Sequence, residues 1–167
     1  MTTTDQKQAV FQEIEQTLKG QGFTIVSQDP HRPWGGFFVM AEDQAQKFAE
    51  TYFEGLNVEG LRISGKLSPK ILVVAPEKRL SWQYHHRRAE IWKVLRGPVG
   101  VVTSATNVEG ELQELGPGAL IRLQQSERHR LVGLREWGVL AEIWQHTDAH
   151  NPSNEDDIVR VQDDFGR

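Results

Sequence analysis

The sequence contains no cysteine, which excludes disulfide bonds and thiolate metal ligands. Any metal site must therefore consist of histidine, carboxylate or amide side chains, and the chain has 6 histidines and 23 acidic residues to supply them. The lack of disulfides fits a protein of a reducing compartment.

Long hydrophobic runs are also missing. No stretch approaches the roughly 20 apolar residues that span a bilayer, and the polar segment from Met1 to Lys7 lacks the apolar core of a signal peptide. We therefore expect a cytoplasmic protein with no membrane partner. The net charge of −4 argues against a nucleic acid partner, because polyanions are bound by basic surfaces. An anionic ligand would need a local basic pocket.

The length and composition are typical of one soluble globular domain. With 167 residues, 38% hydrophobic and 25% charged, the chain is long enough for one core and short for two. We predict a single domain over residues 1–167. It divides into an N-terminal extension (1–60), a barrel core (68–147) and a C-terminal tail (151–167) that packs back on the barrel.

The N-terminal extension carries two helical patterns. Apolar residues recur at helical spacing before Gly20, and a second short helix is expected over Glu42–Phe53. Phe23–Ser27 and Gly36–Met40 are expected to form strands, with a turn at the run Asp29–Pro33 between them. The apolar positions of the first helix are Val10, Phe11, Ile14 and Leu18.

After Leu61 the sequence is a succession of short β-rich runs separated by turn residues. No helical pattern interrupts them, so we expect an antiparallel sandwich or barrel rather than a parallel α/β sheet. The expected strands are Lys70–Ala75, Ile91–Arg96, Val99–Ser104, Glu111–Leu115, Ala119–Leu123, Arg130–Gly133 and Val139–His146.

A candidate metal site begins with a strand that contains Gln83 and His85. In a strand, residues two apart share a face, so these two side chains point the same way. A tight turn through Arg87–Ala89 would place Glu90 at the start of the next strand, and His129 joins from a later strand. Two imidazoles, a carboxylate and an amide oxygen suit one divalent ion, Zn first and Mn, Co, Ni or Fe as alternatives. Four protein ligands leave room for water or substrate, so such a site can be catalytic.

Spacing alone leaves a second interpretation of this cluster open. A pair of histidines after a strand is common in ordinary turns, and Glu90 can equally be a surface ion-pair partner.

The same residues resemble known motifs. Gln83-x-His85-x4-Glu90-x6-Gly97 is similar to the first cupin motif, with glutamine in place of its first histidine. Gly118 through His129 is similar to the second cupin motif. More narrowly, the run Arg79–Trp92 resembles the signature of type II phosphomannose isomerases. Further elements similar to that family are Arg32–Gly35, His129–Leu131 and Glu155–Arg167.

The resemblance implies an all-β fold, the cupin double-stranded β-helix or jelly-roll barrel, with one or two short N-terminal helices. It implies that Gln83, His85, Glu90 and His129 are the metal ligands and that Arg88 belongs to the catalytic signature. The implied activity is that of a metal-dependent aldose–ketose isomerase, which converts the small-molecule sugar phosphate mannose 6-phosphate to fructose 6-phosphate through an enediol. A homodimer is expected, because similar cupins often pair through barrel edges.

An isomerase of this kind needs a base, an acid and groups that stabilise negative charge. We expect Arg88 to stabilise charge or help hold phosphate, and we name His86 and Glu142 as candidates for the base. Glu142 lies in an apolar strand, where a carboxylate has a raised pKa unless it is paired, and it can equally be a structural partner for an arginine. In a regular strand His86 faces away from His85, so a surface role is its alternative. The substrate-binding candidates are Arg87, Arg130, Trp34 and Arg160. In a regular strand Arg130 likewise faces away from its neighbour His129.

Several positions depart from the family pattern. Arg87 stands where family members usually have histidine, and Gln124, Ser126 and Gly133 replace the proline, glycine and asparagine of the second motif. The chain is also too short to include a nucleotidyltransferase half. Two other functions therefore stay open, a non-catalytic cupin that binds a sugar or sugar phosphate and a metal-dependent oxygenase on the same barrel.

Overall fold

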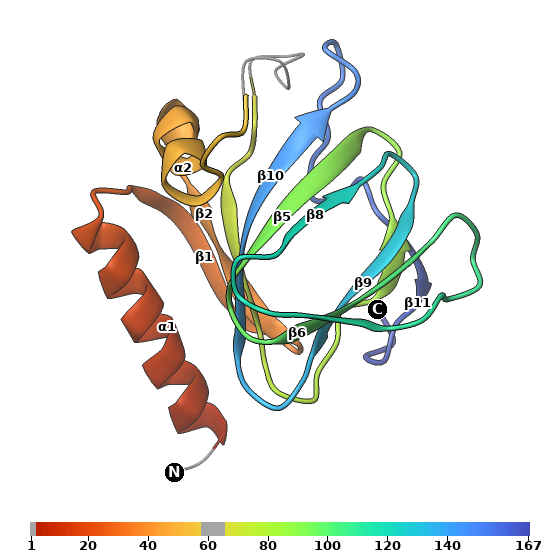
Figure 1. Ribbon diagram of the computed structural model, residues 1–167, viewed down its shortest axis with the longest axis horizontal. Helices are drawn as coiled ribbons and strands as arrows, with labels where there is room; N and C mark the ends of the chain where they lie inside the picture. The colour runs from red at the N-terminus through yellow and green to blue at the C-terminus, as the bar shows by residue number, and fades with distance from the viewer. Residues whose placement is uncertain (1–2, 58–65) are drawn as a thin grey trace.

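The computed structural model describes residues 3–57 and 66–167, which form two facing β-sheets with helices on one side (Figure 1). The N-terminal elements are α1 (Thr3–Gly20), β1 (Ile25–Arg32), β2 (Gly35–Met40), the 3-10 helix η1 (Glu42–Gln44) and α2 (Ala45–Tyr52). The remaining strands are β3 (Lys70–Val74), β4 (Trp82–Tyr84), β5 (Arg88–Arg96), β6 (Val99–Ser104), β7 (Gln113–Leu115), β8 (Leu120–Leu123), β9 (Arg128–Gly133), β10 (Gly138–His146) and β11 (Val159–Gln162).

The strands form two antiparallel sheets. One has the order β1-β2-β3-β10-β5-β8 and the other the order β11-β4-β9-β6-β7. Figure 1 shows the two sheets curving around a common interior, with α1 and α2 on the outside. This architecture confirms the all-β cupin barrel with few helices. It brings residues from β4, β5, β9 and β10 to a shared interior.

The central strands of the six-stranded sheet are buried on both faces. On β3, Ile71 and Val73 pack with the residues of the helices, whereas Leu72 and Val74 belong to the core inside the barrel. Successive strand residues point to opposite faces, so a strand covered on both sides consists almost entirely of apolar residues. In β10 the charged exception is Glu142, which is buried.

The helices cover the outer face of the six-stranded sheet. Helix α1 ends at Gly20 as predicted, and the four apolar residues of its stripe are all buried. Phe48 of α2 is fully buried and packs in the same outer core. β1 and β2 extend the sheet at its edge, and the turn between them carries Trp34 toward the barrel interior.

Several boundaries expected from the sequence are wrong, among them the start of β9, which lies at Arg128 rather than Arg130. β1 continues through Asp29 to Arg32, because this run pairs with β2 across an irregular register and the turn is confined to the two residues that follow. β7 begins two residues later than expected. β5 begins at Arg88, which pairs with His146 of β10, so the tight turn lies at residues 85–87 and Glu90 is the third residue of the strand.

The segment 151–167 follows β10 in the chain and continues along the five-stranded sheet. There β11 pairs with β4, and Arg160 lies opposite Gln83. The segment therefore passes directly beside the β4–β5 turn. The expected homodimer, single-domain division and cytoplasmic location stay predictions.

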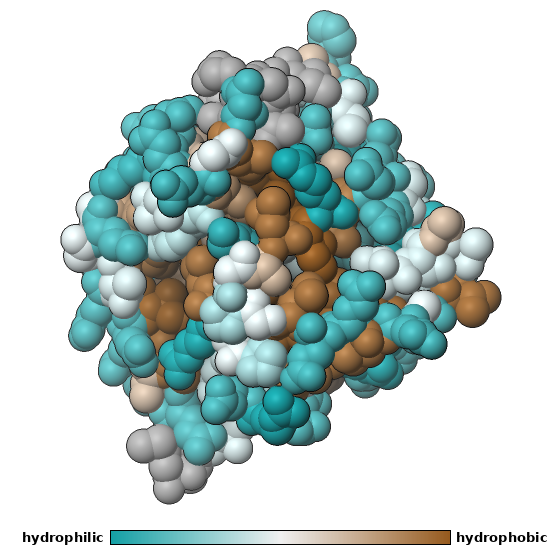
Figure 2. Space-filling model, viewed as in Figure 1, coloured by the Kyte–Doolittle hydropathy of each residue, from teal (hydrophilic) through white to brown (hydrophobic). Residues whose placement is uncertain are grey.

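The surface of the molecule is mostly hydrophilic in the view of Figure 2, and the apolar side chains are seen mainly in its central part. A separate apolar tip projects at the right of this view, where Figure 1 places the loop between β6 and β7. Val108 in that loop is 76% exposed. Among the described residues, no helix combines the length and hydropathy that a membrane span needs.

Candidate metal centre

Three potential metal ligands meet inside the barrel. His85 follows β4, Glu90 lies on β5 and His129 lies on β9, and all three are buried. One ligand atom from each lies within 4.8 Å of the others. The Nε2 atom of His129 is 3.2 Å from Glu90 Oε1, and the Nε2 atom of His85 is 3.6 Å from Glu90 Oε2. His85 and Glu90 are brought together by the tight turn that joins β4 to β5, and His129, 39 positions after Glu90, joins them because β4 pairs with β9.

Both imidazoles are oriented by backbone carbonyls. His85 Nδ1 lies 2.7 Å from the carbonyl oxygen of Asp157, and His129 Nδ1 lies 3.1 Å from that of Glu127. A carbonyl oxygen only accepts hydrogen bonds, so each Nδ1 must carry the proton and donate it. Each Nε2 atom is left with its lone pair directed toward Glu90. Carbonyls orient metal-binding histidines in this way in many proteins.

The cluster fits a divalent cation. His129 Nε2 is buried and has no hydrogen-bond partner in the described part of the chain, which is costly for a lone pair unless a cation satisfies it. Burial lowers the pKa of His85 to about 4, so its imidazole is neutral at pH 7 and can act as a ligand. Burial alone would raise the pKa of Glu90, but His85, Arg88 and His129 hold it well below its usual range. The three residues can therefore hold a metal ion.

Gln83 lies beside this cluster. It pairs in register with His129 across β4 and β9, and it lines the same pocket as His85 and Glu90. Ser81 Oγ donates a hydrogen bond of 2.9 Å to Gln83 Oε1, which fixes the orientation of the amide. Gln83 therefore lies beside the cluster, and its role as a fourth ligand stays a prediction.

Arg88 ties the cluster to the segment 151–167. Its Nε donates to Glu90 Oε2 at 2.9 Å, and its Nη1 donates to Ser153 Oγ at 2.8 Å. The guanidinium also lies 3.6 Å from the ring centre of Trp144. Its Nη2 lies 3.3 Å from His85 Nε2, a hydrogen bond that an ion on this nitrogen would replace. Arg88 thus positions the carboxylate of Glu90.

Asp157 anchors the tight turn between β4 and β5. Its carboxylate accepts hydrogen bonds from the backbone N–H groups of His86 and Arg87, at 3.0 and 2.9 Å, and from Ser153 Oγ at 2.6 Å. Its backbone carbonyl orients His85. Burial raises the pKa of Asp157, but the hydrogen bonds outweigh this effect and the net pKa is lowered.

Replacing Asp157 with alanine is expected to destabilise the protein by about 3 kcal/mol, because two partly buried N–H groups and the buried hydroxyl of Ser153 lose their acceptor. Chemical denaturation measures this change. Because the pKa of Asp157 is lowered on folding, its contribution is present above its ordinary value of 3.8 and is lost as the pH falls through the lower folded pKa. Asp156→Ala removes an exposed neighbour and should change stability by no more than about 0.5 kcal/mol. Equal effects of the two substitutions would show that Asp157 is not an anchor.

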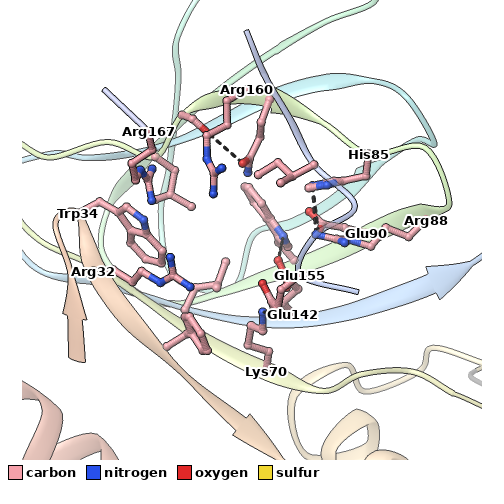
Figure 3. Close-up of a pocket in the computed structure, with 17 residues that line it drawn as sticks. Arg32, Trp34, Lys70, His85, Arg88, Glu90, Glu142, Glu155, Arg160 and Arg167 are labelled. Atoms are coloured by element: carbon pink, nitrogen blue, oxygen red, sulfur yellow. Dashed lines mark hydrogen bonds and ion pairs between the residues drawn. The ribbon is translucent and has the colours of Figure 1, made fainter. Parts of the chain in front are cut away.

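A pocket opens next to the cluster, and Figure 3 shows Glu142 at its wall near Lys70. The indole N–H groups of Trp92 and Trp144 each donate to a carboxylate oxygen of Glu142 at 2.7 Å. Burial raises the pKa of Glu142 to about 7, and the negative charge of Glu90 adds to this effect. A buried carboxyl group that titrates near neutrality can exchange a proton with a ligand in the pocket.

The structure separates the other predicted site residues into two groups. Arg88, Glu142, Trp34 and Arg160 line the pocket. His86 is exposed with its ring against Tyr84, and Arg87 is half-buried and bonded to the carbonyl of Asn151, so neither lines it.

Arg130 is fully buried but outside the pocket. It donates to the carbonyl of Leu80 and to Glu109 and Gln162, on the face of β9 opposite to His129. Strand alternation explains this placement.

Four further charged residues line the pocket, of which three were singled out in the sequence only as parts of stretches that resemble the family, not as site residues. The four are Arg32, Lys70, Glu155 and Arg167. Lys70 is buried and forms an ion pair with Glu155, and its position opposite Glu142 follows from the register of β3 and β10. In the sequence, Lys70 is marked only by its position, as a charged residue at the start of an apolar strand.

The fold and the site together define a cupin with a candidate divalent-metal centre inside its barrel. The chain belongs to the family described as Mannose-6-phosphate isomerase C-terminal, which matches residues 41–163.

Two curated relatives are mannose-1-phosphate guanylyltransferases. ManC of Salmonella typhimurium is 32% identical over 98 residues, which is 59% of this chain and 19% of that protein. The enzyme of Escherichia coli K12 is 25% identical over 142 residues, which is 85% of this chain and 24% of that protein. The chain thus spans less than a quarter of the length of these relatives.

Solved structures share the fold at low sequence identity. KdgF from Halomonas superposes with a TM-score of 0.51 at 14% identity, covering 78% of this chain and 91% of its own. CapF from Staphylococcus aureus gives 0.52 at 12% identity, covering 84% of this chain and 32% of its own. An oxalate oxidase superposes with a TM-score of 0.51 at 19% identity, covering 80% of this chain and 58% of its own. These similarities establish the fold alone.

Proposed function

We propose that this protein is a metal-dependent sugar-phosphate isomerase that interconverts mannose 6-phosphate and fructose 6-phosphate through an enediol. The observation that carries the proposal is a two-histidine, one-carboxylate cluster whose His85 and Glu90 line the same pocket as a buried carboxyl group, Glu142, with a pKa of about 7 in the metal-free protein. Membership of the Mannose-6-phosphate isomerase C-terminal family supports it.

Glu142 has the properties of the proton-transferring group. Isomerisation moves a proton between C1 and C2 of the sugar, so one group must accept the proton and return it. A pKa of about 7 lets the carboxylate do both near neutral pH. The two indole N–H groups hold it in one orientation, and they stabilise its ionised form after it has returned the proton.

The cluster has the properties of a charge-stabilising site. A divalent ion held by Gln83, His85, Glu90 and His129, with zinc the first to test, would supply Lewis-acid stabilisation of negative charge on the substrate oxygens. Arg88 holds the Glu90 carboxylate toward the two imidazoles and adds positive charge at the pocket wall. Trp34, which lines the pocket, offers an apolar surface for one face of the sugar.

A coupled assay that converts fructose 6-phosphate into a reduced nicotinamide signal tests the proposal. We expect activity with mannose 6-phosphate that is lost on chelation and restored by one or more divalent ions. In deuterated water, the product should carry deuterium at the carbon that receives the proton. Binding of mannose 6-phosphate with no conversion under any metal would contradict the isomerase function and would favour a non-catalytic sugar-phosphate-binding protein.

The set of candidate metal ligands is also compatible with a second function, that of an iron-dependent oxygenase. Two histidines and one carboxylate are also the ligands of non-haem iron oxygenases. Oxygen uptake by the Fe(II)-loaded protein in the presence of a sugar substrate, without isomerisation, would identify that function instead.

A further inference from the structure

Three arginine side chains gather on the side of the pocket that is away from the metal centre. Arg32 ends β1, Arg160 lies on β11, and Arg167 follows β11 by a short turn, yet all three line one pocket. Figure 3 shows Arg167 and Arg32 on the same side of the cavity as Trp34, with Arg160 next to Arg167. Glu90 and its neighbours lie across the cavity from them.

The three guanidinium groups are close enough to act on one another. The pKa of Arg160 is lowered from its usual value, first by burial and then by the positive charges of Arg167 and Arg32, with Asp163 acting in the opposite direction. Like charges brought together by folding repel one another, and an anion placed between them relieves the repulsion.

Each of these arginines also has side-chain N–H groups that bond to no other described residue. Arg160 is exposed, and its side chain has no hydrogen-bond or ion-pair partner among the described residues. Arg167 bonds Asp163 through Nε and Nη2, at 2.8 and 3.2 Å, which leaves the two N–H groups of its Nη1. Arg32 is paired with Asp29 through Nε at 3.0 Å. A guanidinium has five N–H donors, so each of the three can bind a further oxyanion.

The other cations of the pocket are already neutralised. Lys70 is paired with Glu155, and Arg88 is paired with Glu90. On the arginine side, Arg32 and Arg167 are paired with Asp29 and Asp163, whereas no carboxylate of the described residues pairs with Arg160, so this side keeps a net positive charge among the residues that line the pocket. The chain as a whole carries a net charge of −4, so an anionic ligand would be drawn to this local patch rather than to the general surface.

We propose that Arg32, Arg160 and Arg167 form the binding site for the phosphate group of the substrate. The sugar then extends from this site toward Glu142 and the metal centre. Planar guanidinium groups bind phosphate oxygens in pairs, which fixes the position of the group as well as its charge. The identity of the sugar rests on the proposed function, whereas phosphate recognition rests on the three arginines themselves. The site also gives β1, an element of the N-terminal extension, a direct part in substrate binding.

Calorimetric titration with inorganic phosphate tests the site. We expect saturable binding to the wild-type protein and to His129→Ala, because the phosphate site is separate from the metal ligands. Arg160→Gln should weaken phosphate binding by about tenfold or more, and Arg160→Lys should fall between them, since lysine keeps the charge but loses the planar fork. Arg160 is exposed, so these substitutions leave the core unchanged. Arg135→Gln is the matched control, because Arg135 is 73% exposed and pairs with Glu114 outside the pocket.

Equal phosphate affinity of the wild-type and Arg160→Gln proteins, or no saturable binding by the wild type, would overturn the site. An equal loss in Arg135→Gln would also overturn it, because the attraction would then be non-specific. With mannose 6-phosphate as substrate, Arg160→Gln should raise KM far more than it lowers kcat.

The kinetic outcome separates this proposal from the proposed function. Isomerase activity with an unchanged KM in Arg160→Gln would reject the phosphate site and leave the isomerase in place. Phosphate binding that depends on Arg160, without turnover of any sugar phosphate, would reject the isomerase and leave the phosphate site in place.

Discussion

Replacing His129 with alanine is expected to abolish divalent-metal binding and to lower isomerase activity by about a thousandfold or more. The imidazole is one of three buried donors that face a common point, and its Nε2 atom has no other hydrogen-bond partner among the described residues. Loss of a residue that merely orients a metal ligand already costs about tenfold to a hundredfold in affinity, so loss of a ligand should cost more. Removal of a group that stabilises transition-state charge costs about a hundredfold to a thousandfold in rate. Metal analysis by mass spectrometry and the coupled assay measure the two effects on the same sample.

The matched control for this substitution is His150→Ala. His150 is exposed in the segment after β10 and does not line the pocket, so metal content and activity should both stay at wild-type levels. A His129→Ala protein that keeps a full complement of metal and normal activity would show that the cluster is not the metal centre.

Glu142→Gln is expected to lower kcat by about a hundredfold to ten-thousandfold while leaving metal content unchanged. The amide has nearly the same shape as the carboxyl group but cannot accept a proton from carbon, and general base catalysis typically contributes rate factors of this size. In the wild type, kcat should rise with pH as Glu142 loses its proton, at a pH below the value of about 7 that its pKa has in the metal-free protein, because a bound cation lowers the pKa of a nearby carboxyl group. This ascending limb should be absent from the residual activity of the variant. Glu136→Gln, a substitution of an exposed carboxylate outside the pocket, is the control and should leave the profile unchanged.

The same carboxyl group has an effect on stability that does not depend on turnover. Its pKa is raised from 4.5 to about 7 in the folded, metal-free protein, so the protonated form is favoured by folding. This contribution is complete below the unfolded pKa and is lost as the pH rises through the folded value. The free energy of unfolding of the wild type should therefore fall relative to that of Glu142→Gln between about pH 4.5 and pH 7. A difference that does not change with pH would mean that Glu142 titrates normally, and the assignment as base would lose its support.

The sequence predicts the barrel and the metal cluster because both depend on short-range patterns. Strand alternation places Gln83 and His85 on one side, and the family motif supplies Glu90 and His129. A lone carboxylate in the apolar run of β10 was enough to single out Glu142, because a strand covered on both faces leaves a charged residue no route to solvent.

Arg88 and Arg160 were predicted as site residues and line the pocket, but other arginines could not be assigned from the sequence in the same way. Arg87 lies in the tight turn between β4 and β5, whose position depends on Asp157, about 70 residues away, so its direction was not predictable from local alternation. Arg32 belongs to a run rich in proline that was expected to be a turn, whereas it pairs with β2 and faces the pocket. Arg167 reaches the same pocket only because β11 pairs with β4. Long-range pairing, rather than residue type, decides which of these cations meet.

The most direct test of the account is a crystal structure of the metal-loaded protein with anomalous diffraction data collected at the absorption edge of the bound ion. We predict one anomalous peak within about 2.0–2.3 Å of His85 Nε2, His129 Nε2 and a carboxylate oxygen of Glu90. A fully loaded protein whose peak lies elsewhere, with these three side chains still bonded only to one another, would contradict the metal centre and every catalytic role derived from it.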